Sequence, residues 1–254
     1  MGSMQKTNIV IPCYNEAARL PTAAFSSYLE SHADVGFVLV DDGSNDATFD
    51  VLTSLAAAHP SAVHVLKLER NCGKAEAVRR GMLMACDLGA DFVGYWDADL
   101  ATPLRFIDVF AKHLSETDAV IVLGSRVRLL GRDVERSTVR HYIGRCFATI
   151  ASLALQMPVY DTQCGAKLLR ASPGIRQLFE QPFELGWTFD VELIARLLRL
   201  AQREGIDPAR KFVEWPLDEW RDAPGSKLRP AHFARIAWEL TRLFGIARRG
   251  PDAG

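Results

Sequence analysis

The sequence predicts an α/β protein with a mostly parallel sheet that carries helices on both faces. Short apolar runs alternate with segments of helical periodicity up to residue 123, which is the pattern of strands joined by crossover helices. Four of these runs end in polar or acidic clusters. With 254 residues, 48% of them hydrophobic, the chain is long enough for one large α/β domain.

The elements can be placed along the chain by their periodicity and by the residues that interrupt them. The first half predicts strands at residues 8–12, 36–40, 62–68, 91–96 and 119–123. The same half predicts helices at residues 17–31, 47–59, 74–89 and 103–116. Asn45 or Asp46 is the expected N-cap of the second helix, and Thr102 that of the fourth. The second half predicts helices at 142–159, 188–203 and 231–249 and an edge strand at 211–216.

Composition and charge argue against several classes of protein. A net charge of −1 gives no overall attraction for nucleic acid. The five cysteines never form a C-x-x-C pair, so they suggest neither a disulfide framework nor a zinc site, and they fit a reducing cytosol. No run of about 18 apolar residues is present, and neither G-x-G-x-x-G nor the P-loop pattern follows the first two strands. We therefore expect a cytoplasmic protein that is neither a dinucleotide oxidoreductase nor a P-loop phosphotransferase.

Two carboxylates, Asp97 and Asp99, follow the fourth predicted strand and are separated by one small residue. The carboxyl ends of parallel strands are where open α/β sheets bind ligands, and carboxylate oxygens suit a divalent cation that also holds phosphate. In a regular strand the two side chains would point in opposite directions, so a shared metal requires a turn, which the intervening alanine permits. The alternative is an ordinary acidic loop between strand and helix.

The other strand ends also carry polar side chains. Tyr14 and Glu16 follow the first strand, where an aromatic ring and an acid could stack on a base and bond to a ribose or uracil edge. The alternative is a loop that only caps the next helix. Lys74 opens a helix, where its positive charge opposes the macrodipole, so it is expected to meet a phosphate or a base oxygen unless it is simply solvated.

Basic residues of the second half offer contacts for a further phosphate. Arginines fall at positions 126, 128, 132, 136 and 140. Their planar forks can each donate two hydrogen bonds to a phosphate, although a solvated strip paired with Asp133 and Glu135 is the alternative. Lys167 is placed either to meet a phosphate or in a plain strand. The basic and aromatic helix at 231–249 fits either a membrane surface or packing on the domain.

Eight motifs stand in one order between Ile9 and Pro230, namely IPCYNE, VDDGSNDAT, NCGKAEAVRRG, DADLATP, GSR, DTQCGAK, FDVEL and GSKLRP. Together they resemble the family 2 glycosyltransferases of the GT-A fold, and most of all the dolichyl-phosphate β-glucosyltransferases. The resemblance implies one GT-A domain at residues 4–250, with a nucleotide-binding half to 123 and an acceptor half from 124. Residues 1–3 have the form of a cloning remnant and are left out.

The resemblance also implies an activity and its site. A nucleotide-sugar would bind across the strand ends, Mg²⁺ or Mn²⁺ would hold its diphosphate, and the sugar would pass with inversion to a polyprenyl phosphate at a membrane surface. Carried onto this chain, the metal ligands would be Asp97 and Asp99. The nucleotide-sugar contacts would be Pro12, Tyr14, Glu16, Asp42, Lys74 and Asp97. The acceptor phosphate is expected at Arg126, Arg136, Lys167 and Lys227.

One departure bears on the donor sugar. Relatives that transfer mannose usually carry a glutamine where this chain has Ala101, whereas the DTQCG motif at 161–165 and the pairing of Trp215 with GSKL at 225–228 resemble the glucosyltransferases. We therefore expect UDP-glucose, with GDP-mannose as the alternative.

The catalytic residues are expected to be Asp99, Asp190 and Arg126. A phosphate acceptor is already anionic at neutral pH and needs no general base, so Asp190 is expected to position. If the acceptor were a saccharide hydroxyl, Asp190 could act as the base. A binding protein that keeps the nucleotide-sugar cradle without turnover is the non-enzymatic alternative.

Overall fold

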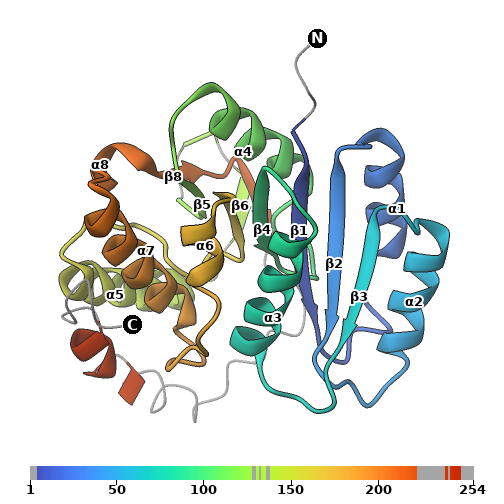
Figure 1. Cartoon of the computed structure of the whole chain (residues 1–254). Helices are drawn as coiled ribbons and strands as arrows, with labels where there is room; N and C mark the ends of the chain where they lie inside the picture. The colour runs from blue at the N-terminus through green and yellow to red at the C-terminus, as the bar shows by residue number, and fades with distance from the viewer. Residues whose placement is uncertain are drawn as a thin grey trace.

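A computed structural model describes residues 5–127, 130–131, 133–135, 138–221, 238–239 and 241–246. Over these residues, seven strands form one sheet in the order β3-β2-β1-β4-β7-β5-β8, and β6 and β9 pair in a small second sheet. Strands β3, β2, β1 and β4 can be followed side by side in Figure 1. The elements are β1 (Thr7–Cys13), α1 (Thr22–Ser31), β2 (Val35–Asp41), α2 (Thr48–Ala58), β3 (Val63–Lys67), α3 (Lys74–Asp87), β4 (Phe92–Trp96), α4 (Arg105–Glu116), β5 (Ile121–Ser125), β6 (Asp133–Glu135), α5 (Thr138–Leu155), β7 (Ala166–Arg170), α6 (Pro173–Gln177), α7 (Phe189–Glu204), α8 (Pro208–Lys211), β8 (Phe212–Pro216) and β9 (Glu219–Arg221).

The sheet is mostly parallel, as the sequence predicts. Strand β1 is parallel to β2 and β4, β2 to β3, and β5 to β8. Strand β7 is antiparallel to both of its neighbours, β4 and β5. Its first residue, Ala166, therefore pairs with the last residue of β4, Trp96. The loop before β7 consequently lies at the carboxyl end of β4, beside the Asp97 and Asp99 motif.

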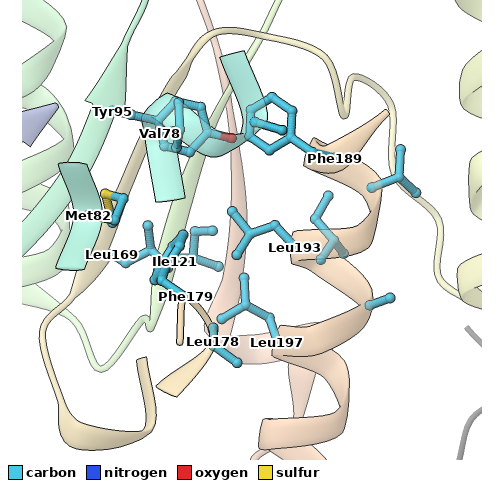
Figure 2. Close-up of a cluster of buried hydrophobic side chains, with 14 of the residues drawn as sticks. Val78, Met82, Tyr95, Ile121, Leu169, Leu178, Phe179, Phe189, Leu193 and Leu197 are labelled. Atoms are coloured by element: carbon cyan, nitrogen blue, oxygen red, sulfur yellow. The ribbon is translucent and has the colours of Figure 1, made fainter. Parts of the chain in front are cut away.

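Two hydrophobic clusters cover the two faces of the sheet, because successive strand side chains point to opposite faces. Val10 belongs to the cluster that contains α3, α5, α6 and α7, whereas Ile9 and Ile11 belong to the cluster that contains α1, α2 and α4. Figure 2 shows part of the first cluster, in which Tyr95 of β4 lies near Phe189 at the start of α7. The prediction of helices on both faces is confirmed.

Several helix starts differ from the predictions. Helix α1 begins at Thr22 rather than at 17, because the backbone N–H groups of Arg19 and Leu20 donate to the Glu16 carbonyl in a separate turn. Helix α4 begins at Arg105, so Thr102 is not its N-cap.

The predictions for the N-cap of α2 and for two helices of the second half also need correction. Ala47, not Asn45 or Asp46, is the N-cap of α2, although the Asp46 carboxylate accepts the Thr48 N–H at 3.0 Å. Helix α5 begins at Thr138, four residues before its predicted start. The expected final helix at 231–249 is helical over 238–239 and 241–246, and its remaining residues lie outside the described part of the chain.

No helix in the described ranges has both the length and the hydropathy that crossing a bilayer requires.

The close pairing of β4 and β7 generates a stability prediction at Gly94. A Cβ added there would lie 2.2 Å from the Lys167 carbonyl oxygen and 2.9 Å from a Leu168 methyl group. Gly94→Ala should therefore force the two strands apart and lower the free energy of unfolding by about 1–3 kcal/mol, measured by urea denaturation. Gly245→Ala is the control, because a Cβ there meets nothing within 4 Å in the part of the chain that the structure describes. Equal midpoints for the two variants would contradict the prediction.

Candidate active site

The loops that follow β1 and β2 are bonded to each other. The Asn15 N–H donates to Ser44 Oγ at 3.0 Å, and the Asn15 side-chain oxygen accepts the Asn45 N–H at 2.9 Å. The Glu16 N–H donates to Thr48 Oγ1 at 2.8 Å. The segment that carries the predicted nucleotide contacts Pro12, Tyr14 and Glu16 is thus fixed against the end of β2. The Glu16 carboxylate itself accepts two hydrogen bonds from the Arg19 guanidinium.

Asp42 joins the end of β2 to the start of α3. Its two carboxylate oxygens accept the backbone N–H groups of Cys72 at 2.7 Å and Gly73 at 2.9 Å. Burial raises the pKa of Asp42, and these two backbone donors act in the opposite direction. Asp42 therefore fastens the loop that places Lys74, which is a structural role that the sequence analysis missed.

The Asp97-Ala98-Asp99 segment forms a turn at the end of β4 instead of continuing the strand. The Leu100 N–H donates to the Asp97 carbonyl at 3.1 Å, and Leu100 has a φ of 50°. The Asp99 carboxylate accepts the Ala101 N–H at 3.1 Å, which stabilises the turn. Desolvation by the surrounding protein and the neighbouring Asp97 charge raise the pKa of Asp99. The two carboxylates therefore influence each other at the end of β4, and a cation between them would relieve their repulsion.

Lys74 lies among the acidic groups of the site. Its ammonium is 2.5 Å from an Asp97 carboxylate oxygen. Burial lowers the pKa of Lys74, but the carboxylates of Asp97, Asp190 and Asp99 outweigh burial and raise it. The expected neighbour of Lys74 was a phosphate or base oxygen, and in this structure its partner is a carboxylate.

The acidic pair fits a divalent cation bound together with a diphosphate. Across the described residues, no group of three His, Cys, Asp or Glu side chains could enclose a metal ion. Mg²⁺ does not need such a cage, because it is usually held by one or two carboxylates with water and phosphate oxygens completing the shell. Carboxylate oxygens suit Mn²⁺ equally well. The chemistry of Asp97 and Asp99 therefore fits either ion, which these two carboxylates would hold together with water and phosphate oxygens.

The loop before β7 sets the position of Asp97. The Asp97 N–H donates to the Gly165 carbonyl at 2.9 Å. A Cβ added to Gly165 would lie 1.9 Å from the Asp97 carboxylate oxygen Oδ2, so the carboxylate occupies space that any other residue would fill. In the sequence this glycine stands out only as part of the DTQCG motif, and the structure supplies its physical role.

The structure corrects the assignment of Lys167 to an acceptor phosphate. The residue is fully buried, and its ammonium donates to the Cys164 carbonyl at 2.6 Å and to Asp190 at 2.5 Å. A buried ammonium must satisfy its donors within the protein, and Lys167 does so here. Asp190, 3% exposed, also accepts a hydrogen bond from the Tyr95 hydroxyl.

Arg126 has a protein partner as well. Its guanidinium donates to both Asp161 carboxylate oxygens, at 2.6 and 2.8 Å, and its side chain is 14% exposed. Burial lowers the pKa of Arg126, but the Asp161 charge outweighs burial and raises it. Arg136 and Lys227, like Arg128 and Arg132, lie outside the described residues.

Solved structures of low sequence identity share this fold. A crystal structure of glucosyl-3-phosphoglycerate synthase from Mycobacterium tuberculosis, in complex with Mn²⁺, uridine diphosphate and glucosyl-3-phosphoglycerate, matches 99% of this chain and 82% of its own with a TM-score of 0.64 and 20% identity. A second structure of that synthase matches 99% and 83% with a TM-score of 0.66 and 19% identity. The fold is therefore that of the GT-A glycosyltransferases.

The sequence comparison narrows the class to one family. The sequence profile described as Glycosyl transferase family 2 matches residues 8–173. The chain belongs to glycosyltransferase family 2, and the predicted transferase class is confirmed.

Two relatives illustrate the degree of similarity. The chain is 34% identical to a dolichyl-phosphate beta-glucosyltransferase of Dictyostelium discoideum, over 93% of this chain and 73% of the relative. It is 29% identical to one of Saccharomyces cerevisiae, over 87% of this chain and 68% of the relative. These matches confirm the resemblance that the motifs suggest.

The contact at Gly165 predicts a selective loss of metal-dependent binding. In Gly165→Ala the new methyl group should displace the Asp97 carboxylate and weaken Mn²⁺-dependent UDP binding at least tenfold, or about 1.4 kcal/mol, in isothermal titration calorimetry. Gly245→Ala should bind as the wild type does. Unchanged affinity in a folded Gly165→Ala variant would show that the Asp97 position does not control metal binding.

Proposed function

We propose that the protein transfers glucose from UDP-glucose to a polyprenyl phosphate with inversion and with the help of Mg²⁺ or Mn²⁺. The observation that carries the proposal is the turn that holds Asp97 and Asp99 at the carboxyl end of β4, next to Lys74. The names of the relatives support the glucose donor and the lipid phosphate acceptor. The Mn²⁺ and uridine diphosphate in the complex of the glucosyl-3-phosphoglycerate synthase support the cofactor and the nucleotide.

The donor would bind along the carboxyl edge of β1, β2 and β4. Pro12, Tyr14, Glu16 and Asp42 follow or end these strands and are proposed to contact or frame the nucleotide. Lys74, already paired with Asp97, is proposed to reach the diphosphate. Ala101 in place of a glutamine supports glucose over mannose as the transferred sugar.

In this reaction the protein has to align the acceptor with the anomeric carbon and to help neutralise the leaving diphosphate. When bound, the cation supplies charge that stabilises the leaving diphosphate. The acceptor phosphate is already anionic at neutral pH, so the protein has only to hold it behind the anomeric carbon. In this scheme Asp190 does not have to take a proton from the acceptor. Its burial and its bonds to Lys167 and Tyr95 support a positioning role rather than that of a general base.

The acceptor phosphate is proposed to meet Arg126, Arg136 and Lys227. The Arg126 guanidinium has five N–H groups, of which Asp161 takes two, so the same side chain has donors to offer to a phosphate. Lys167 is not included in this set, because its ammonium is buried and paired.

The lipid acceptor implies work at a membrane surface, proposed here as peripheral contact from the cytoplasmic side. Trp187 and Trp238 are 39% and 56% exposed, and the backbone N–H of Trp187 donates at 3.0 Å to the carboxylate of Glu239, the residue that follows Trp238. Exposed indoles favour the interface between water and lipid.

A transfer assay tests the donor, the metal and the acceptor together. With Mn²⁺ or Mg²⁺, UDP-glucose and undecaprenyl or dolichyl phosphate, we expect glucosylated lipid phosphate, lost with EDTA and in Asp99→Asn. UDP-glucose should outcompete GDP-mannose. Preference for GDP-mannose by more than about tenfold, roughly 1.4 kcal/mol, would refute the donor assignment. Transfer only to a saccharide hydroxyl would refute the acceptor.

The proposed acceptor site predicts a change confined to one substrate. Arg136→Ala should raise the KM for the lipid phosphate about 10- to 150-fold, because a charge-assisted hydrogen bond is worth about 1.5 to 3 kcal/mol. Affinity for UDP-glucose should stay within about twofold. Arg176→Ala is the control, since Arg176 pairs at the surface with Asp87 and Glu180. A loss of donor affinity instead would assign Arg136 to the diphosphate.

A further inference from the structure

A buried cluster of charged and polar groups lies next to the strand end that carries Asp97 and Asp99. Lys167 of β7 is fully buried, and the Asp190 side chain at the start of α7 is 5% exposed. The Tyr95 hydroxyl of β4 donates to the same Asp190 oxygen, Oδ1, that accepts from Lys167. Figure 2 shows the Tyr95 hydroxyl directed toward the first turn of α7. Three segments that are distant in the sequence thus meet at one carboxylate oxygen.

Stability alone does not account for this pair. Moving two charges out of water costs several kcal/mol for each ion, and a well-packed apolar pair is often as stable or more so. Apolar packing reaches the pair, because Phe189 lies with its ring centroid 5.9 Å from that of Tyr95 and belongs, like Leu169, to the same hydrophobic cluster. This buried ion pair is therefore better explained by the groups that it holds in position than by its contribution to stability.

Lys167 connects Asp190 to the loop that seats Asp97. Its ammonium donates to the Cys164 carbonyl at 2.6 Å. The next residue, Gly165, accepts the Asp97 N–H at 2.9 Å and makes room for the Asp97 carboxylate. A displacement of the Cys164 carbonyl would therefore move both the backbone partner and the steric boundary of Asp97.

Separate contacts hold the other end of this loop. Arg126 donates to both oxygens of the Asp161 carboxylate. The Glu214 carboxylate accepts the N–H groups of Tyr160 and Asp161, each at 2.8 Å. With residues 160–161 fixed by these bonds, the position of the 164–165 end depends on Lys167 and on the β7 pairing.

We propose that Lys167 and Asp190 are positioning residues that hold Asp97 in place for the cation through the 160–165 loop. Asp190 anchors the Lys167 ammonium, and Tyr95 holds Asp190 from β4, two residues before Asp97. This inference rests on the proposed role of Asp97 toward the metal. It gives Asp190 a function that needs a hydrogen-bond acceptor and no proton transfer.

The test uses a double substitution that removes both charges and leaves the shapes nearly unchanged. In Lys167→Met/Asp190→Asn the amide oxygen still accepts from Tyr95, so no buried charge is left unpaired and the fold should survive, which circular dichroism checks. The control is Arg196→Met/Glu192→Gln, which removes another ion pair, with N···O of 2.7 Å and side chains 12% and 2% exposed. None of the contacts of that pair involves the 160–165 loop.

Two measurements give the outcome. Mn²⁺-dependent UDP affinity should fall at least tenfold in the double variant and stay unchanged in the control. Hydrogen exchange at residues 97–100 should accelerate in the double variant only, because the Asp97 N–H loses its fixed acceptor. Unchanged exchange and affinity, or equal losses in the control, would overturn the proposal.

The exchange measurement separates this inference from the proposed function. If the wild-type protein shows no Mn²⁺-dependent UDP binding, the proposed function fails, while the exchange rates still decide whether Lys167 positions Asp97. The single variant Asp190→Asn completes the test. Retained lipid glucosylation across neutral pH supports positioning, whereas near-complete loss of transfer with unchanged UDP binding would make Asp190 a base and overturn its assigned role.

Discussion

The site depends on the close approach of the 160–165 loop to the end of β4. Because β7 enters the sheet antiparallel to β4, its first residue pairs with Trp96, and Gly165 lies directly against Asp97. The missing side chain at 165 leaves the space that the Asp97 carboxylate occupies. A parallel strand at this position would have brought its carboxyl end, and not its start, to the same edge. One reversal of strand direction thus places a loop of the second half next to the acidic motif of the first.

Charged groups of both signs lie close together at this edge of the sheet. Three carboxylates, Asp97, Asp99 and Asp190, raise the pKa of Lys74, and desolvation raises the pKa of Asp99. The buried Asp190 carboxylate interacts more strongly than it would at an open surface, whereas Lys74 and Asp97, with side chains 40% and 36% exposed, are partly screened by water. The proposed cation and diphosphate carry opposite charges, and this edge offers carboxylates to the first and the Lys74 ammonium to the second.

The strands and turns that depend on local sequence pattern were predictable from the sequence. The apolar runs predict β1 and β4 nearly to the residue, and the spacing of Asp97 and Asp99 predicts the turn that the structure contains. The direction of β7 was not predictable, because its five residues do not show which strands it will pair with or in which direction. Lys167 was misassigned for the same reason: its partner, Asp190, is 23 residues away along the chain, and only the fold shows that the ammonium is buried.

The first turn of α7 has a consequence for recombination between relatives. Asp190 comes from the second half of the chain, whereas Tyr95, which donates to it, comes from the first. Phe189 and Tyr95 also pack with ring centroids 5.9 Å apart. A chimaera that takes a foreign second half at residue 124 would import α7, Lys167 and the 160–165 loop together but would keep the native Tyr95. Such an exchange would have to match the Tyr95 hydroxyl as well as the close contacts of Gly94 with β7 and of Asp97 with Gly165.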